Sequence, residues 1–258
     1  MSRQKPSRLV KRWLRSLIGR DVFQLRQCSV EGVVLGSRYG SWFVSLEGLD
    51  PTVVVFSFGV GRDICFERAL IERFGVTVHA FDPTPLALEW VRAQRLPDRM
   101  VMHELGLADH DGTARFIPSQ QAGDENFSMV RRTGIGDPIE APVRRFVTLV
   151  SLVGAVPAVV KLDIEGTEYA VLPDMLSSGF RPRQLLVEFH HRWREVGPRR
   201  TREAIRLLNR HGYRVADVSP KGKEYTFVLR GPPHPERSEG PAQRSSEVGG
   251  AGPSLRSG

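Results

Sequence analysis

Cysteine is nearly absent from this chain: only Cys28 and Cys65 occur among 258 residues. Two cysteines cannot build a disulfide framework, and these two lack the paired spacing of a zinc site, so we expect reduced thiols. No apolar run approaches the ~20 residues that a membrane-spanning helix requires. Residues 1–20 also lack the long apolar stretch and the small-residue cleavage site of a secretory signal. The sequence therefore predicts a cytoplasmic protein.

Acidic residues are missing from residues 1–20, which carry seven lysines and arginines of a chain whose net charge is +8. With those seven bases and the three of residues 231–258 set aside, residues 21–230 hold 27 bases against 26 acids. The body is therefore nearly neutral and lacks the broad basic channel of a nucleic-acid-binding protein. We expect no nucleic-acid partner.

The basic arm, residues 1–20, has the pattern of an amphipathic helix. Its apolar residues recur at helical spacing: Leu9, Val10, Trp13, Leu14, Leu17 and Ile18. One interpretation is peripheral contact with an anionic membrane surface or with nucleic acid. The other, which we favour, is a helix whose apolar stripe packs on the domain, because such stripes most often face a core.

The C-terminal tail differs in composition from the rest of the chain. Residues 231–258 contain 16 glycines, prolines and serines among 28 residues, with Val248 and Leu255 as the only large aliphatic side chains. Such a segment buries too little apolar surface to offset the entropy of ordering, so we expect disorder. The chain therefore divides into an arm (1–20), a domain (21–230) and a tail (231–258).

Within the domain, short β-rich runs alternate with helical segments. The predicted strands are Val53–Phe58, Val76–Phe81, Val101–Glu104, Val159–Leu162, Leu185–Phe189, Tyr213–Val218 and Tyr225–Leu229. Predicted helices span about Asp63–Phe74, about Glu168–Ser177 and about Thr201–Arg210, and another begins near Pro85. This order predicts a doubly wound, mostly parallel α/β sheet with an antiparallel C-terminal edge strand.

Ligands of such sheets bind beyond the carboxyl ends of the strands. After the first strand come Gly59 and Gly61, which let the backbone approach a ligand closely. Asp82 follows the second strand, 21 residues after Gly61, a distance that suits hydrogen bonding to ribose hydroxyls. This pattern favours a cofactor that contains adenosine; the alternative is a tight turn with a capping aspartate.

The residues after the glycines discriminate between cofactors. A dinucleotide site requires G-x-G-x-x-G, but Ile64 stands at the third glycine position and Asp63 would repel a pyrophosphate. No G-x-x-x-x-G-K-[ST] loop is present, which disfavours an NTPase. S-adenosylmethionine has no phosphate, and its positive charges tolerate nearby carboxylates.

Five segments resemble the successive motifs of FkbM-type S-adenosylmethionine-dependent methyltransferases. They are FSFGVGRDICFE (56–67), HAFDPTP (79–85), GLADHDG (106–112), VKLDIEGTEYAVL (160–172) and LVEFH (186–190). The resemblance covers roughly residues 50–230. It implies the Rossmann-like class I methyltransferase fold and O-methylation of a hydroxyl, often on a sugar, a glycolipid or another small molecule.

The resemblance also implies roles for individual residues. It places Gly59 and Gly61 in the cofactor loop, Asp82 on the ribose, Asp109 near the adenine, and Asp163 in the charged segment after the fourth strand. Two departures concern the methionine end of the cofactor. Ser57 stands where many class I methyltransferases have an acid, and Asp63 replaces their last glycine. Ser57 is nevertheless expected to contact the cofactor, and Asp63 or Glu67 is expected to supply a displaced carboxylate.

Carboxylates clustered at a strand end are candidates for acid and base chemistry. Asp163 and Glu165 are candidate bases for the hydroxyl proton, although Glu165 and Glu168 also suit a helix N-terminus on charge grounds alone. His190 and His191 must point to opposite sides of an extended segment. We expect His190 to face the site and to be a catalytic residue with Asp163 and Glu165. Mixed carboxylate and imidazole groups suit divalent ions, but this spacing is not diagnostic and no metal is predicted.

Two further expectations concern substrate and function. We expect the long irregular insertion Gly123–Pro142 to act as an acceptor-binding lid, because such insertions are often functional. The leading function is a small-molecule O-methyltransferase. The alternatives are a degenerate, non-catalytic binding module and, less favoured, a nucleic-acid methyltransferase, because the D/N-P-P-Y-type loop of amino-methylating enzymes is replaced by Asp-Ile-Glu-Gly.

Overall fold

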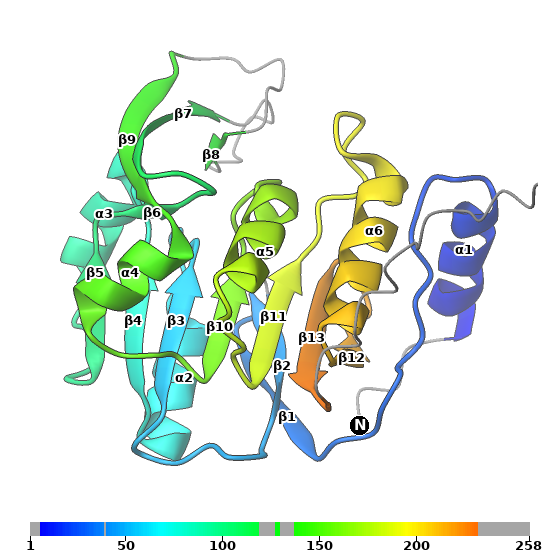
Figure 1. The fold of residues 1–258 in the computed structure, drawn as a ribbon, viewed down its shortest axis with the longest axis horizontal. Helices are drawn as coiled ribbons and strands as arrows, with labels where there is room; N and C mark the ends of the chain where they lie inside the picture. The colour runs from blue at the N-terminus through cyan, green and yellow to red at the C-terminus, as the bar shows by residue number, and fades with distance from the viewer. Residues whose placement is uncertain (1–5, 39, 119–126, 130–136, 232–258) are drawn as a thin grey trace, which may run out of the picture.

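A seven-stranded sheet with helices on both faces forms the body of the protein (Figure 1). The computed structural model describes residues 6–38, 40–118, 127–129 and 137–231. The strands are β3 (Val54–Phe58), β4 (Thr77–Phe81), β5 (Met100–His103), β10 (Val159–Leu162), β11 (Gln184–Glu188), β12 (Tyr213–Val218) and β13 (Glu224–Leu229). Their order across the sheet is β12-β13-β11-β10-β3-β4-β5.

The strand directions confirm the predicted fold class. Strands β5, β4, β3, β10 and β11 pair in parallel, and β13 is antiparallel to both β11 and β12. One detail of the prediction is wrong, because β12 forms the edge and the antiparallel β13 lies inside the sheet. Residues Tyr225–Val228 of β13 are buried on both faces, as an interior strand requires, whereas β12 carries an irregularity between Val215 and Asp217 that an edge tolerates.

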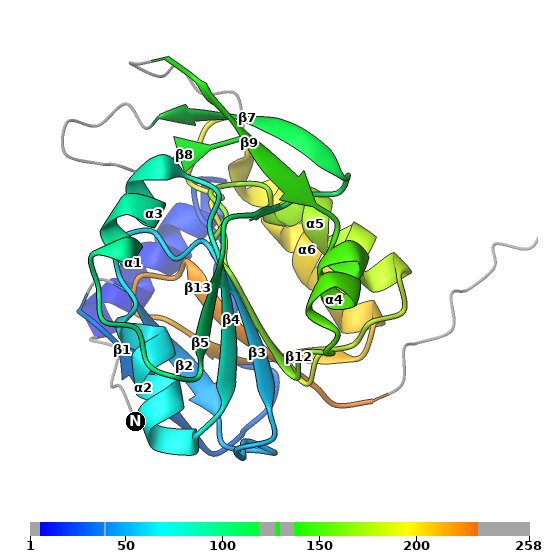
Figure 2. The same ribbon diagram turned by 90° about the vertical axis from the view of Figure 1, so that its left-hand side faces the viewer.

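Two helical layers cover the sheet (Figure 2). Helices α2 (Cys65–Phe74) and α3 (Pro85–Arg92) lie on one face, and α4 (Phe146–Val153), α5 (Glu168–Ser177) and α6 (Gly197–Arg210) lie on the other. Alternate residues of β3 enter opposite core clusters: Phe56 and Phe58 pack towards the α4–α6 layer, and Val55 packs towards α2. Both faces of β3 are therefore buried, as its apolar run predicts.

A second, four-stranded sheet interrupts the connection between β5 and β10. It contains β6 (Gly106–Leu107), β7 (Gly112–Pro118), β8 (Phe127–Ser128) and β9 (Ile139–Arg144), in the order β6-β9-β7-β8. The prediction of an irregular segment over Gly123–Pro142 is therefore wrong for the residues of β8 and β9, while 123–126 and 130–136 lie outside the described residues. The hairpin β1 (Gly32–Gly36) and β2 (Ser41–Ser45), which packs against α2, was also not predicted.

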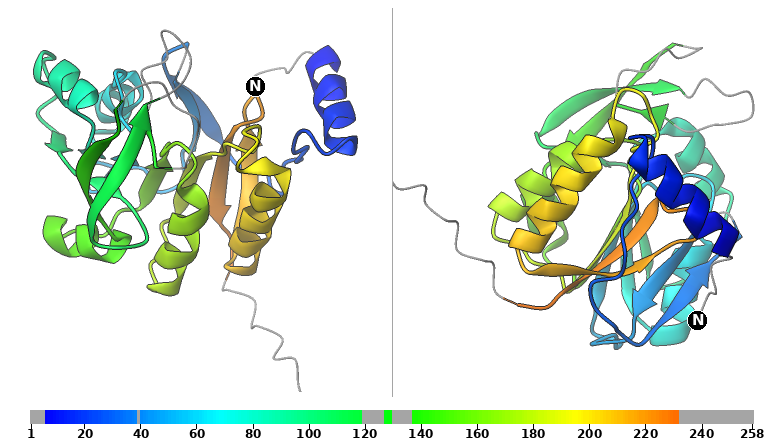
Figure 3. Two further views of the ribbon diagram at one scale, coloured as in Figure 1. Left: turned by 90° about the horizontal axis from the view of Figure 1, so that it is seen from above. Right: turned by 90° about the vertical axis from the view of Figure 1, so that its right-hand side faces the viewer.

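The basic arm forms the predicted helix, α1 (Pro6–Leu17), at one end of the molecule (Figure 3). The interpretation that its apolar stripe packs on the domain is wrong, because Val10, Trp13, Leu14 and Leu17 are all exposed. Among the described helices, none is long and apolar enough to cross a membrane. Cys28 and Cys65 are free, and the predicted disordered tail lies outside the described residues.

Candidate active site

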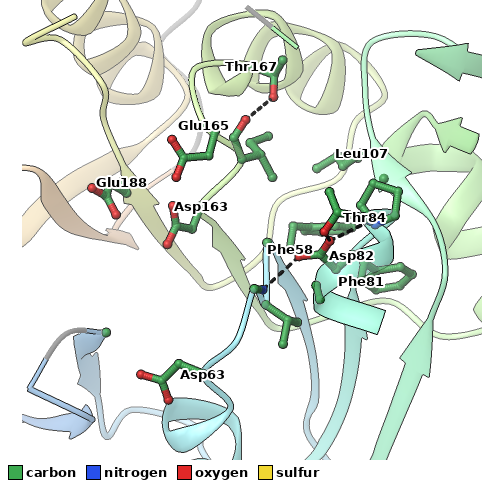
Figure 4. Close-up of a pocket in the computed structure, with 18 of the residues that line it drawn as sticks. Phe58, Asp63, Phe81, Asp82, Thr84, Leu107, Asp163, Glu165, Thr167 and Glu188 are labelled. Atoms are coloured by element: carbon green, nitrogen blue, oxygen red, sulfur yellow. Dashed lines mark hydrogen bonds between the residues drawn. The ribbon is translucent and has the colours of Figure 1, made fainter. Parts of the chain in front are cut away.

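A cleft of about 810 Å³ opens beyond the carboxyl ends of β3, β4, β10 and β11 (Figure 4). Part of its lining comes from the loops that follow these strands, and Phe116 of β7 and Met129, directly after β8, also line it. A volume of this size suits a small-molecule cofactor together with part of an acceptor. The cleft is therefore where the ligand site of a doubly wound sheet is expected.

The glycine loop after β3 forms one wall of the cleft. Gly59 and Gly61 have φ values of +76° and +57°, a region that side-chain-bearing residues rarely adopt. A Cβ on Gly59 would lie 1.7 Å from the carbonyl oxygen of Asp163, so only glycine lets the two loops approach so closely. A Cβ on Gly61 would meet open space, which leaves room for a ligand beside this residue.

Asp82 joins the glycine loop to the loop after β4. Its Oδ2 accepts a hydrogen bond from the Gly61 amide at 2.9 Å, and its Oδ1 accepts bonds from the Thr84 amide and hydroxyl at 2.9 and 2.6 Å. Only 5% of the residue is exposed, but it lines the cleft. The carboxylate is therefore fixed in direction before any ligand arrives.

A buried ion pair lies beneath the glycine loop. Lys161 donates from Nζ to the carbonyl oxygen of Gly59 at 3.0 Å, and the same Nζ lies 3.7 Å from Oε1 of Glu67. Ser57 donates its hydroxyl to that Oε1 at 2.5 Å, and the Trp42 ring lies 5.7 Å from the ammonium. Ser57 and Glu67 are fully buried and do not line the cleft. The prediction that they contact the cofactor is therefore corrected: they support the loop from below.

Asp63 lines the opposite, outer side of the loop. Ser37 in the β1–β2 hairpin donates a hydrogen bond to its carboxylate, and the Cys65 amide donates another at 2.9 Å. Burial alone would raise its pKa, but these hydrogen bonds lower the pKa of Asp63 below its usual value. The residue therefore places a negative charge in a fixed position on the wall of the cleft.

A second group of charges lies across the cleft at the ends of β10 and β11. Asp163 and Glu188 point towards one another (Figure 4), and Lys223 from the turn before β13 forms an ion pair with Glu188. Burial and the Glu188 charge raise the pKa of Asp163 well above its usual value. Burial also acts to raise that of Glu188, but His190 and Lys223 bring the pKa of Glu188 below normal. Of the two carboxyl groups, Asp163 therefore binds a proton more readily than Glu188 does.

His190 lies in the cleft, as predicted, between two glutamates. Its Nδ1 is 3.0 Å from Glu168 and its Nε2 is 3.3 Å from Glu165. Although burial would lower the pKa of His190, the charges of Glu168 and Glu165 raise it well above the usual value. The Trp193 ring covers the imidazole, with centroids 4.4 Å apart. The two glutamates therefore favour the protonated form of the ring, and His190 lies between them at ion-pair distance.

Two other predicted residues lie apart from this cluster. His191 faces the other side of the chain, as the alternation predicts, and its Nε2 lies 2.7 Å from Oδ1 of Asp21. Asp109 does not line the cleft; it lies beside a separate cavity of about 340 Å³, exposed and paired with His110. The structure therefore does not bring Asp109 to the cleft, although Gly106 and Leu107 of the preceding β6 line it.

The sequence did not identify Lys223 as a residue of the site, and it did not predict a role for Lys161. A lysine near a turn has no distinctive spacing, although Lys223 does lie between the predicted strands Tyr213–Val218 and Tyr225–Leu229. Asp163, Glu165 and His190 also offer ligand atoms within 4.8 Å of one another, a mixed oxygen and nitrogen set that could hold a divalent cation.

Comparison with known proteins adds evidence independent of this geometry. Residues 59–215 match the model of the methyltransferase FkbM domain. The chain is 26% identical over 199 residues to the 31-O-demethyl-FK506 methyltransferase FkbM of Streptomyces tacrolimicus, covering 65% of this chain and 75% of that protein. TYW2 of Pyrococcus horikoshii, solved with MeSAdo, is 13% identical with a TM-score of 0.32, over 87% and 84% of the two chains. A TM-score this low has no bearing on fold or function. The matched domain spans the glycine loop, Asp82 and the carboxylate cluster, and the chain belongs to the FkbM methyltransferase family.

Proposed function

We propose that this protein transfers the methyl group of S-adenosylmethionine to a hydroxyl of a small molecule, a sugar or a glycolipid. The observation that carries the proposal is the arrangement of the cleft. A glycine loop fixed by Asp82 faces a partly buried pair of carboxyl groups, Asp163 and Glu188, across a single cavity. A methyl donor and a proton acceptor are what O-methylation requires on the two sides of such a cavity.

The cleft residues fit the proposed cofactor. The open space beside Gly61 and the neighbouring carboxylate of Asp82 suit a ribose with two hydroxyl groups. Leu86, Trp90 and Leu107 line the cleft next to Asp82 and provide an apolar wall for an adenine ring. The fixed negative charge of Asp63 suits a cationic methionine end. When bound, S-adenosylmethionine supplies a methyl group on a positively charged sulfur.

The carboxylate cluster supplies the proton chemistry. In this proposal the ionised form of Asp163 accepts the hydroxyl proton as the oxygen takes the methyl group. Because burial and Glu188 raise the pKa of Asp163, its ionised form is a stronger base than an ordinary aspartate. His190 does not act as the base, since both of its nitrogens face glutamates that stabilise the protonated ring. It holds Glu165, which remains a second candidate for contact with the acceptor.

The relative's name supports an oxygen as the acceptor atom. The Streptomyces tacrolimicus protein is named for methylation of 31-O-demethyl-FK506, which makes a hydroxyl of a small molecule the first acceptor class to test here. Phe116 of β7 and Met129, directly after β8, line the cleft. The proposed lid role of this region therefore rests on these two residues.

The decisive experiment is calorimetric titration with S-adenosylhomocysteine, beside NAD and ATP. We expect micromolar binding of S-adenosylhomocysteine alone, loss of binding in Asp82→Ala, and no change in Asp109→Ala, a matched aspartate outside the cleft. Transfer of a labelled methyl group to 31-O-demethyl-FK506 and to a panel of hydroxylated sugars then tests the acceptor class. A folded protein that does not bind S-adenosylhomocysteine would refute the proposal and favour a non-catalytic binding module.

A further inference from the structure

Helix α1 packs on the domain with its polar side and exposes its apolar side. Arg12 is only 6% exposed; it lies against Gly222 and donates from Nη2 to the carbonyl oxygen of Val22 at 3.3 Å. Trp13 and Leu17, by contrast, are 47% and 65% exposed. This is the reverse of an ordinary surface helix, whose apolar stripe faces the core.

The exposed apolar residues of α1 form a patch that has no counterpart in the rest of the described chain. Eleven large hydrophobic residues are exposed among the described residues. Five of them fall within nine consecutive positions: Val10, Trp13, Leu14, Leu17 and Ile18. The first four are spaced i, i+3, i+4 and i+7, so they share one face of the helix. A contiguous patch of this kind marks an interaction surface.

Positive charge borders the patch. Lys11 and Arg20 are exposed, and the Arg15 side chain is 45% exposed at 3.9 Å from Asp21. Lys11 and Arg15 lie four residues apart and share a face beside the apolar one. Residues 1–20 contain seven bases and no acid. Among the described residues of the arm, those beside the apolar patch therefore include bases and no acid.

We propose that α1 is a docking surface for an anionic lipid membrane, on which it lies with the apolar patch in the headgroup region. A helix with a Trp- and Leu-containing face and a Lys- and Arg-rich face is the type that binds such interfaces. Charge favours this occupant over a second copy of the chain, because two patches would bring together two borders that carry only bases. RNA would use the bases but would leave the apolar face exposed.

The docked helix would hold the cleft at the membrane. Asp21, which follows α1 closely, accepts hydrogen bonds from His191 at 2.7 Å and from Arg192 at 2.9 Å, immediately after His190 of the cleft. Arg192 also donates to the carbonyl oxygen of Lys221, which lines the cleft. The helix is thereby fixed to the rim of the cleft. The membrane proposal does not depend on the proposed methyl transfer, because none of the α1 residues lines the cleft.

The test is flotation of the full chain with vesicles of phosphatidylcholine alone or with phosphatidylglycerol added. We expect binding only to the anionic vesicles, weakened by salt. The double variant Leu14→Glu with Leu17→Glu should bind at least about tenfold more weakly, because each leucine loses its burial in the lipid. Lys11→Gln should bind about fivefold more weakly, the usual contribution of one base near an anionic surface. The matched control, Leu152→Glu on α4, exchanges a leucine that is 63% exposed and should bind as the original chain does.

Three results would overturn the proposal. The first is no flotation with anionic vesicles, and the second is equal loss in Leu152→Glu and in the α1 double variant. The third is self-association without vesicles that the double variant abolishes, which would make the patch a contact between copies. Binding of S-adenosylhomocysteine by the double variant is measured in parallel. If that binding persists while flotation is lost, the arm and the cofactor site are separate, and a failure of either proposal can be told from a failure of the other.

Discussion

Replacement of Lys161 tests whether the buried ion pair supports the glycine loop. Lys161→Met keeps the length of the side chain but removes the ammonium from its position 3.7 Å from Glu67 and 3.0 Å from the Gly59 carbonyl oxygen. The two side chains are only 5% and 1% exposed, so water cannot replace the lost partner. Breaking one side of such a buried pair costs about 3–5 kcal/mol of unfolding free energy, because it leaves an uncompensated charge.

A double-mutant cycle separates this effect from simple loss of packing. Glu67→Gln can still accept the hydrogen bond from the Ser57 hydroxyl, and combined with Lys161→Met it removes both buried charges. We expect the double variant to recover at least about 2 kcal/mol relative to Lys161→Met alone. Urea unfolding measures the stabilities, and titration with S-adenosylhomocysteine reports whether the loop still binds. Additive single effects, or a loss below about 1 kcal/mol in Lys161→Met, would refute the account of the buried pair.

Three other predictions concern the loop, the base and a histidine pair. Gly59→Ala should lose much more stability in urea unfolding than Gly61→Ala, since the Cβ at position 59 would meet the Asp163 carbonyl oxygen at 1.7 Å. Gly61→Ala, with open space around its Cβ, should lose only about 1 kcal/mol. Equal losses of stability would contradict the close approach of the two loops. Asp163→Asn should lower kcat about 10²–10⁴-fold with little change in cofactor affinity. The original enzyme should lose activity when acid protonates Asp163, and this loss should begin at a higher pH than for an ordinary aspartate because the pKa of Asp163 is raised. An activity unchanged in the variant would exclude Asp163 as the base. Nδ1 of His79 lies 2.9 Å from Nε2 of His103. Burial lowers the pKa values of both histidines, and the neighbouring His103 ring lowers that of His79 further. As the pH drops through about 6.5 the unfolded chain therefore binds protons first, so the stability of the fold should fall; urea unfolding of His103→Gln should show a weaker dependence on pH.

Much of the main sheet could be predicted because its signals are local. The apolar run of β3 and the positive φ that Gly59 requires are encoded within a few residues. The small sheet was missed because β6 and β8 contain two residues each, and their pairing depends on residues far along the chain. The orientation of α1 was wrong for a different reason. Its apolar periodicity was read correctly, but the contact of Arg12 with Gly222 is a tertiary one that periodicity cannot show.

The alternating directions of the side chains along β3 predict the position of Ser57 better than the comparison of motifs does. Phe56 and Phe58 point into the α4–α6 layer, so Ser57 between them must point to the opposite face, where α2 brings Glu67. This alone removes Ser57 from the list of direct cofactor ligands and makes it a support for Glu67. The same reasoning succeeded at the end of β11, where it separated His190 in the cleft from His191, which binds Asp21. An acid missing from a motif position therefore need not mean a degenerate site, because here the buried Lys161–Glu67 pair fixes the loop from behind while the half-buried Asp63 lines the cleft in front.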